Sequence, residues 1–130
     1  MDETMKELQD YDFEINKYTG NDWDFGENNP YYNPDKCGLV PVCEIEWSEP
    51  DYSFDTTVIW KAENGKLYTA SDSGCSCPMP FEDYHKLSDL TIVDKNVLDN
   101  LKTQMRNNNY ITPEKAQEFF YKIRDAVKSW

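Results

Sequence analysis

The sequence predicts an α+β fold: a small antiparallel sheet of three to four strands with two C-terminal helices packed on it. Three observations support this. Apolar and polar residues alternate in the first half of the chain, an Asn-Gly pair separates two strand-like segments, and apolar residues recur at helical spacing after residue 94. The length of 130 residues fits one domain. We divide this domain, residues 1–130, into an acidic N-terminal arm (1–36), a β core (37–83) and a helical C-terminal part (94–130).

The N-terminal arm combines a strand-like segment with a long loop. Residues 10–15 alternate strictly between acidic and apolar side chains, which is the period of a half-buried strand. Residues 19–36 are rich in Gly, Asn, Pro and Asp and therefore predict a loop, although they include Trp23 and Phe25.

The β core begins with a strand over residues 39–47. Alternation places Cys43, Ile45 and Trp47 on one face and the two intervening glutamates on the other.

Two further strands are predicted over residues 52–61 and 66–71. Residues 63–65 (Glu-Asn-Gly) supply the positive-φ positions that a tight hairpin needs. Two prolines and a glycine within residues 72–83 predict an irregular, shaped loop.

The C-terminal part predicts two amphipathic helices. Asp94 is a candidate N-cap for the first, and the Asn run at 107–109 ends it. The second begins at Thr112-Pro113, because Thr is a good N-cap and Pro favours the first helical position. The expected buried residues are Val97, Leu98, Leu101 and Met105 in the first helix and Ala116, Phe119, Phe120, Ile123, Val127 and Trp130 in the second.

The acidic charge is distributed unevenly along the chain. The net charge is −12, and residues 1–60 hold fifteen acids against three lysines, whereas residues 61–130 hold ten acids and ten bases. Such a chain repels nucleic acid and anionic membranes, so a charged partner would be basic. No stretch approaches the roughly 20 apolar residues of a membrane helix, and the acidic start lacks the apolar region of a signal peptide. We therefore expect a cytoplasmic protein.

The four cysteines do not form a standard metal signature. Cys37 and Cys43 are separated by five residues and Cys75 and Cys77 by one, whereas structural zinc favours two to four intervening residues. We expect reduced thiols and no cofactor, with Cys75 and Cys77 as weak candidate metal ligands. A Cys75/His85 pair permits a thiol-enzyme hypothesis, but no third residue is placed to orient a base, so we expect no enzyme and no catalytic residue. An acidic calcium loop at residues 22–27 is a further weak alternative, because its glycine lies one position early.

Acids interleaved with aromatic residues remain as the candidate binding feature. Carboxylates on a rigid scaffold can imitate the phosphates of nucleic acid, and a flanking tryptophan adds contact area. The alternative is an ordinary solvated surface beside an aromatic core. The expected partner-binding residues are Asp10, Asp12, Glu14, Asp22, Trp23, Asp24 and Glu27.

A family resemblance rests on residues 49–55 (EPDYSFD), the Asn64-Gly65 turn and residues 70–78 (ASDSGCSCP) with Pro80-Phe81-Glu82. These motifs resemble a domain family of unknown function found in bacteriophages and bacteria, over roughly residues 30–90. The acidic arm and the C-terminal helices lie outside that resemblance, which implies a phage-type context and no particular chemistry.

The combined expectation is a small phage-type inhibitor that acts in the cytoplasm of the infected host cell. It would occupy the nucleic-acid groove of a basic host protein, such as a CRISPR effector or another nucleic-acid-binding enzyme, by carboxylate mimicry, without binding nucleic acid itself. Such a protein would be an anti-CRISPR or other anti-defence factor. The alternative is a structural or regulatory phage module, which zinc would stabilise through cysteines.

Overall fold

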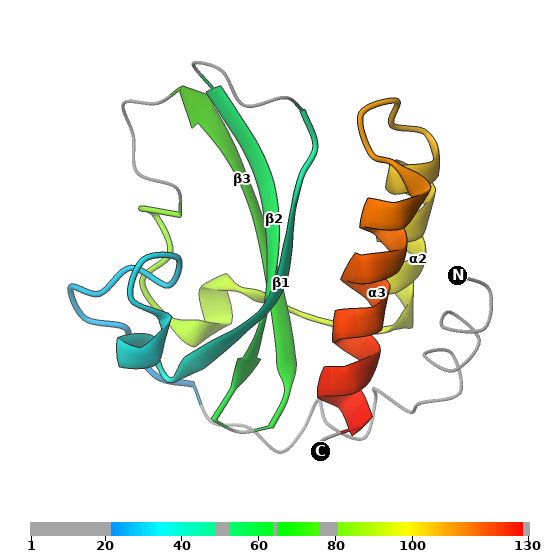
Figure 1. Ribbon diagram of the computed structural model, residues 1–130. Coiled ribbons are helices and arrows are strands. Elements are labelled where there is room, and N and C mark those ends of the chain that lie inside the picture. Colours follow the sequence, from blue (N-terminus) through cyan, green and yellow to red (C-terminus); the bar gives the residue numbers. More distant parts are fainter. Residues whose placement is uncertain (1–21, 49–52, 64, 76–80, 129–130) are drawn as a thin grey trace.

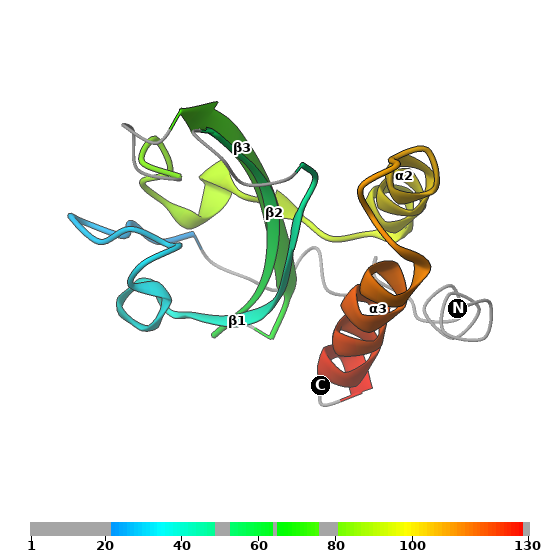
Figure 2. The same ribbon diagram turned by 45° about the horizontal axis from the view of Figure 1, so that its top comes forward.

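The computed structural model describes residues 22–48, 53–63, 65–75 and 81–128, which form three layers (Figure 1). An antiparallel sheet lies in the middle, with two α-helices on one of its faces. On the other face lie residues 22–38 and 81–90, which we call the loop layer. Figure 2 shows from a second direction that the loop layer and the helices lie on opposite sides of the sheet. The predicted α+β class is confirmed.

The sheet has four strands in the order β1-β2-β3-β4. They are β1 (Leu39–Glu46), β2 (Ser53–Ala62), β3 (Leu67–Cys75) and the short β4 (Thr91–Ile92). All neighbouring strands are antiparallel. Beside β4 the chain passes from the loop layer to the helices (Figure 1).

Strand β1 has the predicted alternation. Cys43 and Ile45 are buried on the helix side, while Glu44 between them is exposed. Trp47 directly follows the strand and packs partly buried against the same cluster. Because side chains in a strand alternate between its faces, this face assignment could be made before the structure was known.

The turn between β2 and β3 is the predicted tight hairpin. The Ala62 N–H donates to the Lys66 carbonyl at 2.9 Å, and the Gly65 N–H donates to the Ala62 carbonyl at 2.9 Å. Gly65 has φ = +84°, a conformation that glycine adopts without steric penalty.

Strand β3 is longer than the sequence predicts. Residues 72–75 were expected to belong to an irregular loop, but they continue the strand and pair with the start of β2, with Asp72 opposite Thr56 and Cys75 opposite Ser53. Hydrogen bonding to a neighbouring strand outweighs the weak intrinsic strand preference of Asp and Gly here.

The two helices begin and end close to the predicted positions. Helix α2 (Lys95–Arg106) is capped by Asp94, whose carboxylate accepts a hydrogen bond from the Val97 N–H at 2.9 Å. Helix α3 (Pro113–Lys128) is capped by Thr112, whose hydroxyl oxygen accepts from the Lys115 N–H at 3.2 Å. No helix among the described residues is long and apolar enough to cross a bilayer.

Each face of the sheet carries its own hydrophobic cluster. The helix-side cluster joins Ile59 and Leu67 of the sheet to Leu101, Phe120 and other residues of the two helices. The loop-side cluster is built around Trp60, which is 1% exposed. Around Trp60 pack apolar residues of the sheet and the loop layer: Phe25, Cys37, Leu39, Val58, Ala62, Tyr68, Ala70, Phe81, Leu87 and Leu90. Loops without extended regular structure therefore cover one face of the central sheet, and the helices cover the other.

The caps give the first test. Asp94→Ala should lower the free energy of unfolding by about 1 kcal/mol, because it removes the acceptor for an otherwise unpaired helix N–H. Asp99→Ala makes the same chemical change on an exposed position of the same helix. It should leave stability unchanged or raise it by a few tenths of a kcal/mol, since Ala has the higher helix propensity. Chemical denaturation measures both, and equal losses would refute the cap assignment.

Candidate protein-binding surface

The loop layer is held together by hydrogen bonds between two segments that are about sixty residues apart in the sequence. The Phe25 N–H donates to the His85 carbonyl at 2.8 Å, and the Leu87 N–H donates to the Trp23 carbonyl at 2.9 Å. Asp24 and Lys86 form an isolated antiparallel bridge between these two bonds. Acids from both segments are thereby brought into one layer.

Three carboxylates serve this framework. Asp22 Oδ1 accepts from the Trp23 N–H at 3.0 Å and from the Ser88 N–H at 2.9 Å, so it links the two segments. Asp72 accepts from the Phe81 N–H at 2.7 Å and ties β3 to the second segment.

Asp89 stabilises the turn that follows His85. Its Oδ2 accepts from the backbone N–H groups of His85 at 2.8 Å and Lys86 at 3.1 Å. The bond from His85 is the largest cause of a lowered pKa for this carboxyl group, because a hydrogen bond donated to the carboxylate favours its charged form.

Five other acids of the loop layer have no such role. Among the described residues, the carboxylates of Asp24, Glu27, Asp35, Glu82 and Asp83 make no hydrogen bond and no ion pair, and all five side chains are exposed. They are therefore available to a partner.

The pKa of Tyr84 is raised by burial and by the negative charges around its ring. Its hydroxyl donates to the Ser71 carbonyl at 3.1 Å. Burial raises the pKa of this phenol, and the neighbouring carboxylates of Asp72, Asp89 and Asp83 raise it further, because they disfavour a second negative charge. Acids of β3 and of the second loop segment thus converge around one ring.

Charge differs between the two outer layers. Residues 22–38 and 81–90 hold seven acids against Lys36 and Lys86. Helices α2 and α3 together hold four acids and seven bases. The net charge is therefore negative in the loop layer and positive in the two helices on the other side of the sheet.

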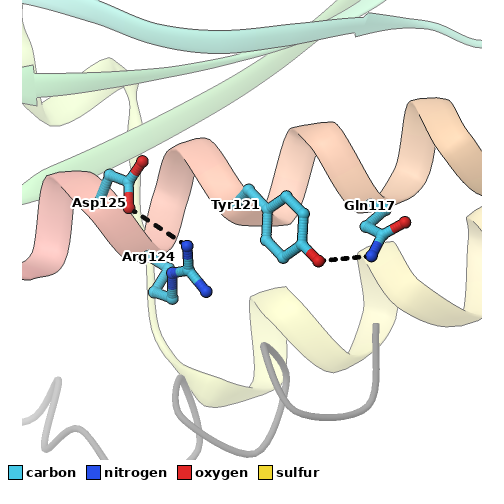
Figure 3. Close-up of polar contacts among 4 residues, drawn as sticks. All are labelled: Gln117, Tyr121, Arg124 and Asp125. Atoms are coloured by element: carbon cyan, nitrogen blue, oxygen red, sulfur yellow. Dashed lines mark hydrogen bonds and ion pairs between the residues drawn. The ribbon is translucent and has the colours of Figure 1, made fainter.

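Side chains on α3 also contact one another (Figure 3). Gln117 donates a hydrogen bond to the Tyr121 hydroxyl, and Arg124 forms an ion pair with Asp125 at 3.5 Å. The Arg124 guanidinium is also 4.8 Å from the centre of the Tyr121 ring. These contacts are of a kind that stabilises a solvated helix face by small amounts.

The predicted partner-binding residues have different environments. Asp10, Asp12 and Glu14 lie outside the described residues. Asp24 and Glu27 are exposed, whereas Asp22 is exposed but bonded within the framework. Trp23 is half-buried, because its indole N–H donates to the Cys37 carbonyl at 2.8 Å and its ring packs against the loop-side cluster. It anchors the loop to the sheet and leaves only part of its ring for a partner.

Sequence reasoning did not include Glu82, Asp83 and Asp89 in this surface. They belong to the half of the chain whose charges sum to zero, and the bases that balance them lie mostly in the helices. The backbone hydrogen bonds that place them beside residues 22–27 leave no local signal in the sequence.

Two cysteines are placed where they cannot share one metal ion. Cys37 belongs to the loop-side cluster and Cys43 to the helix-side cluster, so the sheet separates them. Burial raises the pKa of both thiols and disfavours the thiolate that binds zinc. The Cys75 side chain and all of Cys77 lie outside the described residues, so the structure does not address their candidate metal site.

Comparison with known proteins places the chain in a family. The family model named "Domain of unknown function (DUF7574)" matches residues 28–130, so the chain belongs to this family. No curated protein and no solved structure matches the chain. The match includes both C-terminal helices, which we had expected to lie outside the family resemblance. It begins after Glu27, so Asp22, Trp23, Asp24 and Glu27 precede the matched domain.

Asp89 provides a test of the hydrogen bonds that hold the loop layer together. Its folded pKa is lowered, so its hydrogen bonds should add stability above the unfolded pKa of about 3.9, and this contribution should disappear as the pH falls through the folded pKa. Asp89→Ala should therefore be less stable than wild type at pH 7, and the difference should narrow below about pH 5. Asp83→Ala removes a neighbouring charge without a hydrogen bond and should stay within about 0.5 kcal/mol of wild type. Urea unfolding at a series of pH values measures both variants, and a difference for Asp89→Ala that is constant with pH would contradict its role.

Proposed function

We propose that this member of the DUF7574 family binds a basic groove of a nucleic-acid-handling host protein through the carboxylates of its loop layer and thereby blocks that groove. In the fullest form of the proposal the chain is phage-encoded and acts in the cytoplasm of the infected cell. The partner would then be a defence enzyme such as a CRISPR effector, which holds nucleic acid in a positively charged channel.

The observation that carries this proposal is the set of five unpaired, exposed acids, Asp24, Glu27, Asp35, Glu82 and Asp83, on a framework of hydrogen bonds. Unpaired carboxylates keep their full charge for a partner. Because the backbone beneath them is fixed by bonds such as Phe25 to His85, less ordering entropy is lost on binding.

The separation of charge between the layers adds a second argument. The molecule has an acidic loop layer and a net basic helix layer, so its field favours one orientation as it approaches a cationic partner. Such a field raises association rates and weakens as salt is added. Asp10, Asp12 and Glu14 precede this layer in the chain and belong to the proposal as additional acids.

Two double variants with the same change in net charge test the proposal. Asp24→Lys with Glu27→Lys reverses charge in the loop layer, while Asp99→Lys with Asp125→Lys reverses it on the helices. The first should weaken binding of captured host proteins at least tenfold, and the second should change it by less than threefold. The immobilised chain would capture proteins from a bacterial lysate at low salt, and elution by salt and by double-stranded DNA would be compared.

DNA should compete with the chain for its partner, because both would occupy the same groove. Two results would each contradict the proposal: equal weakening by the two double variants, or captured proteins that DNA does not release. Either result would favour an interaction module whose acids only keep it soluble. Circular dichroism of both double variants confirms that they remain folded.

A further inference from the structure

A polar groove lies between the sheet and α2, on the side away from the loop layer. The register of β2 and β3 pairs Ile59 with Thr69, then Thr57 with Ser71, then Asp55 with Ser73 along the helix-facing side. The pairs Lys61–Leu67 and Ile59–Thr69 each contain one apolar residue, whereas the pairs Thr57–Ser71 and Asp55–Ser73 contain none. The Thr57 and Ser71 hydroxyl groups are hydrogen-bonded to each other at 2.5 Å, and the Asp55 carboxylate lies beyond them. A sheet face covered by helices is normally apolar throughout, so these polar pairs are a departure from the core pattern.

The helix above these polar pairs is polar as well. Thr103, Gln104 and Asn107 line the groove from the last turns of α2 and the residue that follows it, while Leu101 and Met105 of the same helix enter the core. The lining combines these polar groups with the apolar surface of Trp47, and an open hollow of about 540 Å³ remains between the two elements. A second cavity of about 280 Å³ continues it and shares Ser71 and Gln104.

Trp47 lines the same groove and is fixed in place. Its indole N–H donates to Thr57 Oγ1 at 2.7 Å, and its carbonyl accepts from the Asn108 amide at 2.9 Å. The ring is therefore oriented before any ligand arrives. An aromatic surface held in this way loses little entropy on binding.

Hydrogen-bonding groups around the ring are available. Among the described residues, the side chains of Asp55, Thr103, Gln104 and Asn107 make no hydrogen bond with protein atoms. The two amides supply both donors and acceptors, the threonine hydroxyl supplies one of each, and the carboxylate accepts only. No lysine or arginine lines either cavity, so a phosphate or sulfate group would face Asp55 without a compensating cation.

We infer that this groove binds a neutral saccharide. A sugar ring presents closely spaced hydroxyl groups to the amides and to Asp55, and its C–H face lies against the indole of Trp47. The volume suits a short oligosaccharide, since small-ligand sites occupy roughly 300–1,000 Å³. This site is separate from the loop layer and does not depend on the function proposed above.

The test is an NMR titration of the full chain with neutral trisaccharides of glucose, galactose, mannose or N-acetylglucosamine. The reporters are the indole N–H of Trp47, assigned through Trp47→Phe, and the side-chain amides of Gln104 and Asn107. At least one sugar should shift these signals with saturation, with a dissociation constant on the order of 1 mM, as expected for a shallow polar site.

Matched variants locate the site. Gln104→Ala with Asn107→Ala, and separately Asp55→Asn, should each weaken binding at least tenfold, while Gln117→Ala on the outer face of α3 should leave it unchanged. Asp55→Asn changes charge with almost no change in volume, and a dispersed spectrum shows that each variant is folded. The inference is overturned if no trisaccharide shifts the reporters, if ATP shifts them and no sugar does, or if the groove variants bind as wild type does.

Discussion

The burial of both faces of the β2–β3 pair is the constraint on which the rest of the structure depends. Val58 and Trp60 enter one hydrophobic cluster while Ile59 enters the other, so two covering layers are required. The chain supplies helices for only one face. The other is covered by loops, whose backbone N–H groups need partners when they leave water, and short acidic and amide side chains provide them. Asp22, Asp72 and Asp89 accept from six backbone N–H groups of the loop layer and β3, and Asn29 accepts from two more. Part of the acidity of this protein is therefore structural.

The difference between acids that are hydrogen-bonded within the fold and acids that are unpaired changes how the negative charge should be interpreted. A count of acids treats all of them alike, but an acid that holds a turn closed has already used its hydrogen-bonding capacity within the fold. Glu27 and Glu82, which line a common small hollow beside Tyr84, have no such role. Like charges placed close together destabilise a fold unless something else supports the arrangement. The bonds between Phe25 and His85 and between Trp23 and Leu87 provide that support here, so the loop layer can hold unpaired charge together on a fixed backbone.

The features that could be predicted from the sequence are those that depend on interactions between residues close together in the chain. The caps Asp94 and Thr112, the Gly65 turn and the alternation through Cys43 and Ile45 depend on residues within a few positions of one another, and all were predicted correctly. The continuation of β3 through Asp72 to Cys75 depends on a partner strand, so a local preference for turns misled the prediction. The pairing of residues 22–27 with residues 82–89 depends on contacts across about sixty residues, and no periodicity reveals it. Trp23 shows the same limit, because its sequence neighbours are acidic while its indole donates to the distant Cys37 carbonyl.

On the helix-facing side of β2 and β3, polar residues likewise take the place of apolar packing. Thr57, Ser71 and Asp55 belong to register pairs without an apolar residue, whereas the pairs Ile59–Thr69 and Lys61–Leu67 each contain one, and α2 meets them with amides instead of closing onto them. Filling this space with leucine or valine would bury more apolar surface, and each buried side chain of that kind would add roughly 1.5–3 kcal/mol. The chain instead keeps hydrogen-bonding groups around an indole fixed by Thr57. The buried Thr57 hydroxyl is satisfied by Trp47 and Ser71, and Gln104 and Asn107 are exposed, so this stripe gives up apolar burial without leaving a buried group unpaired, and it keeps its amides open to a ligand.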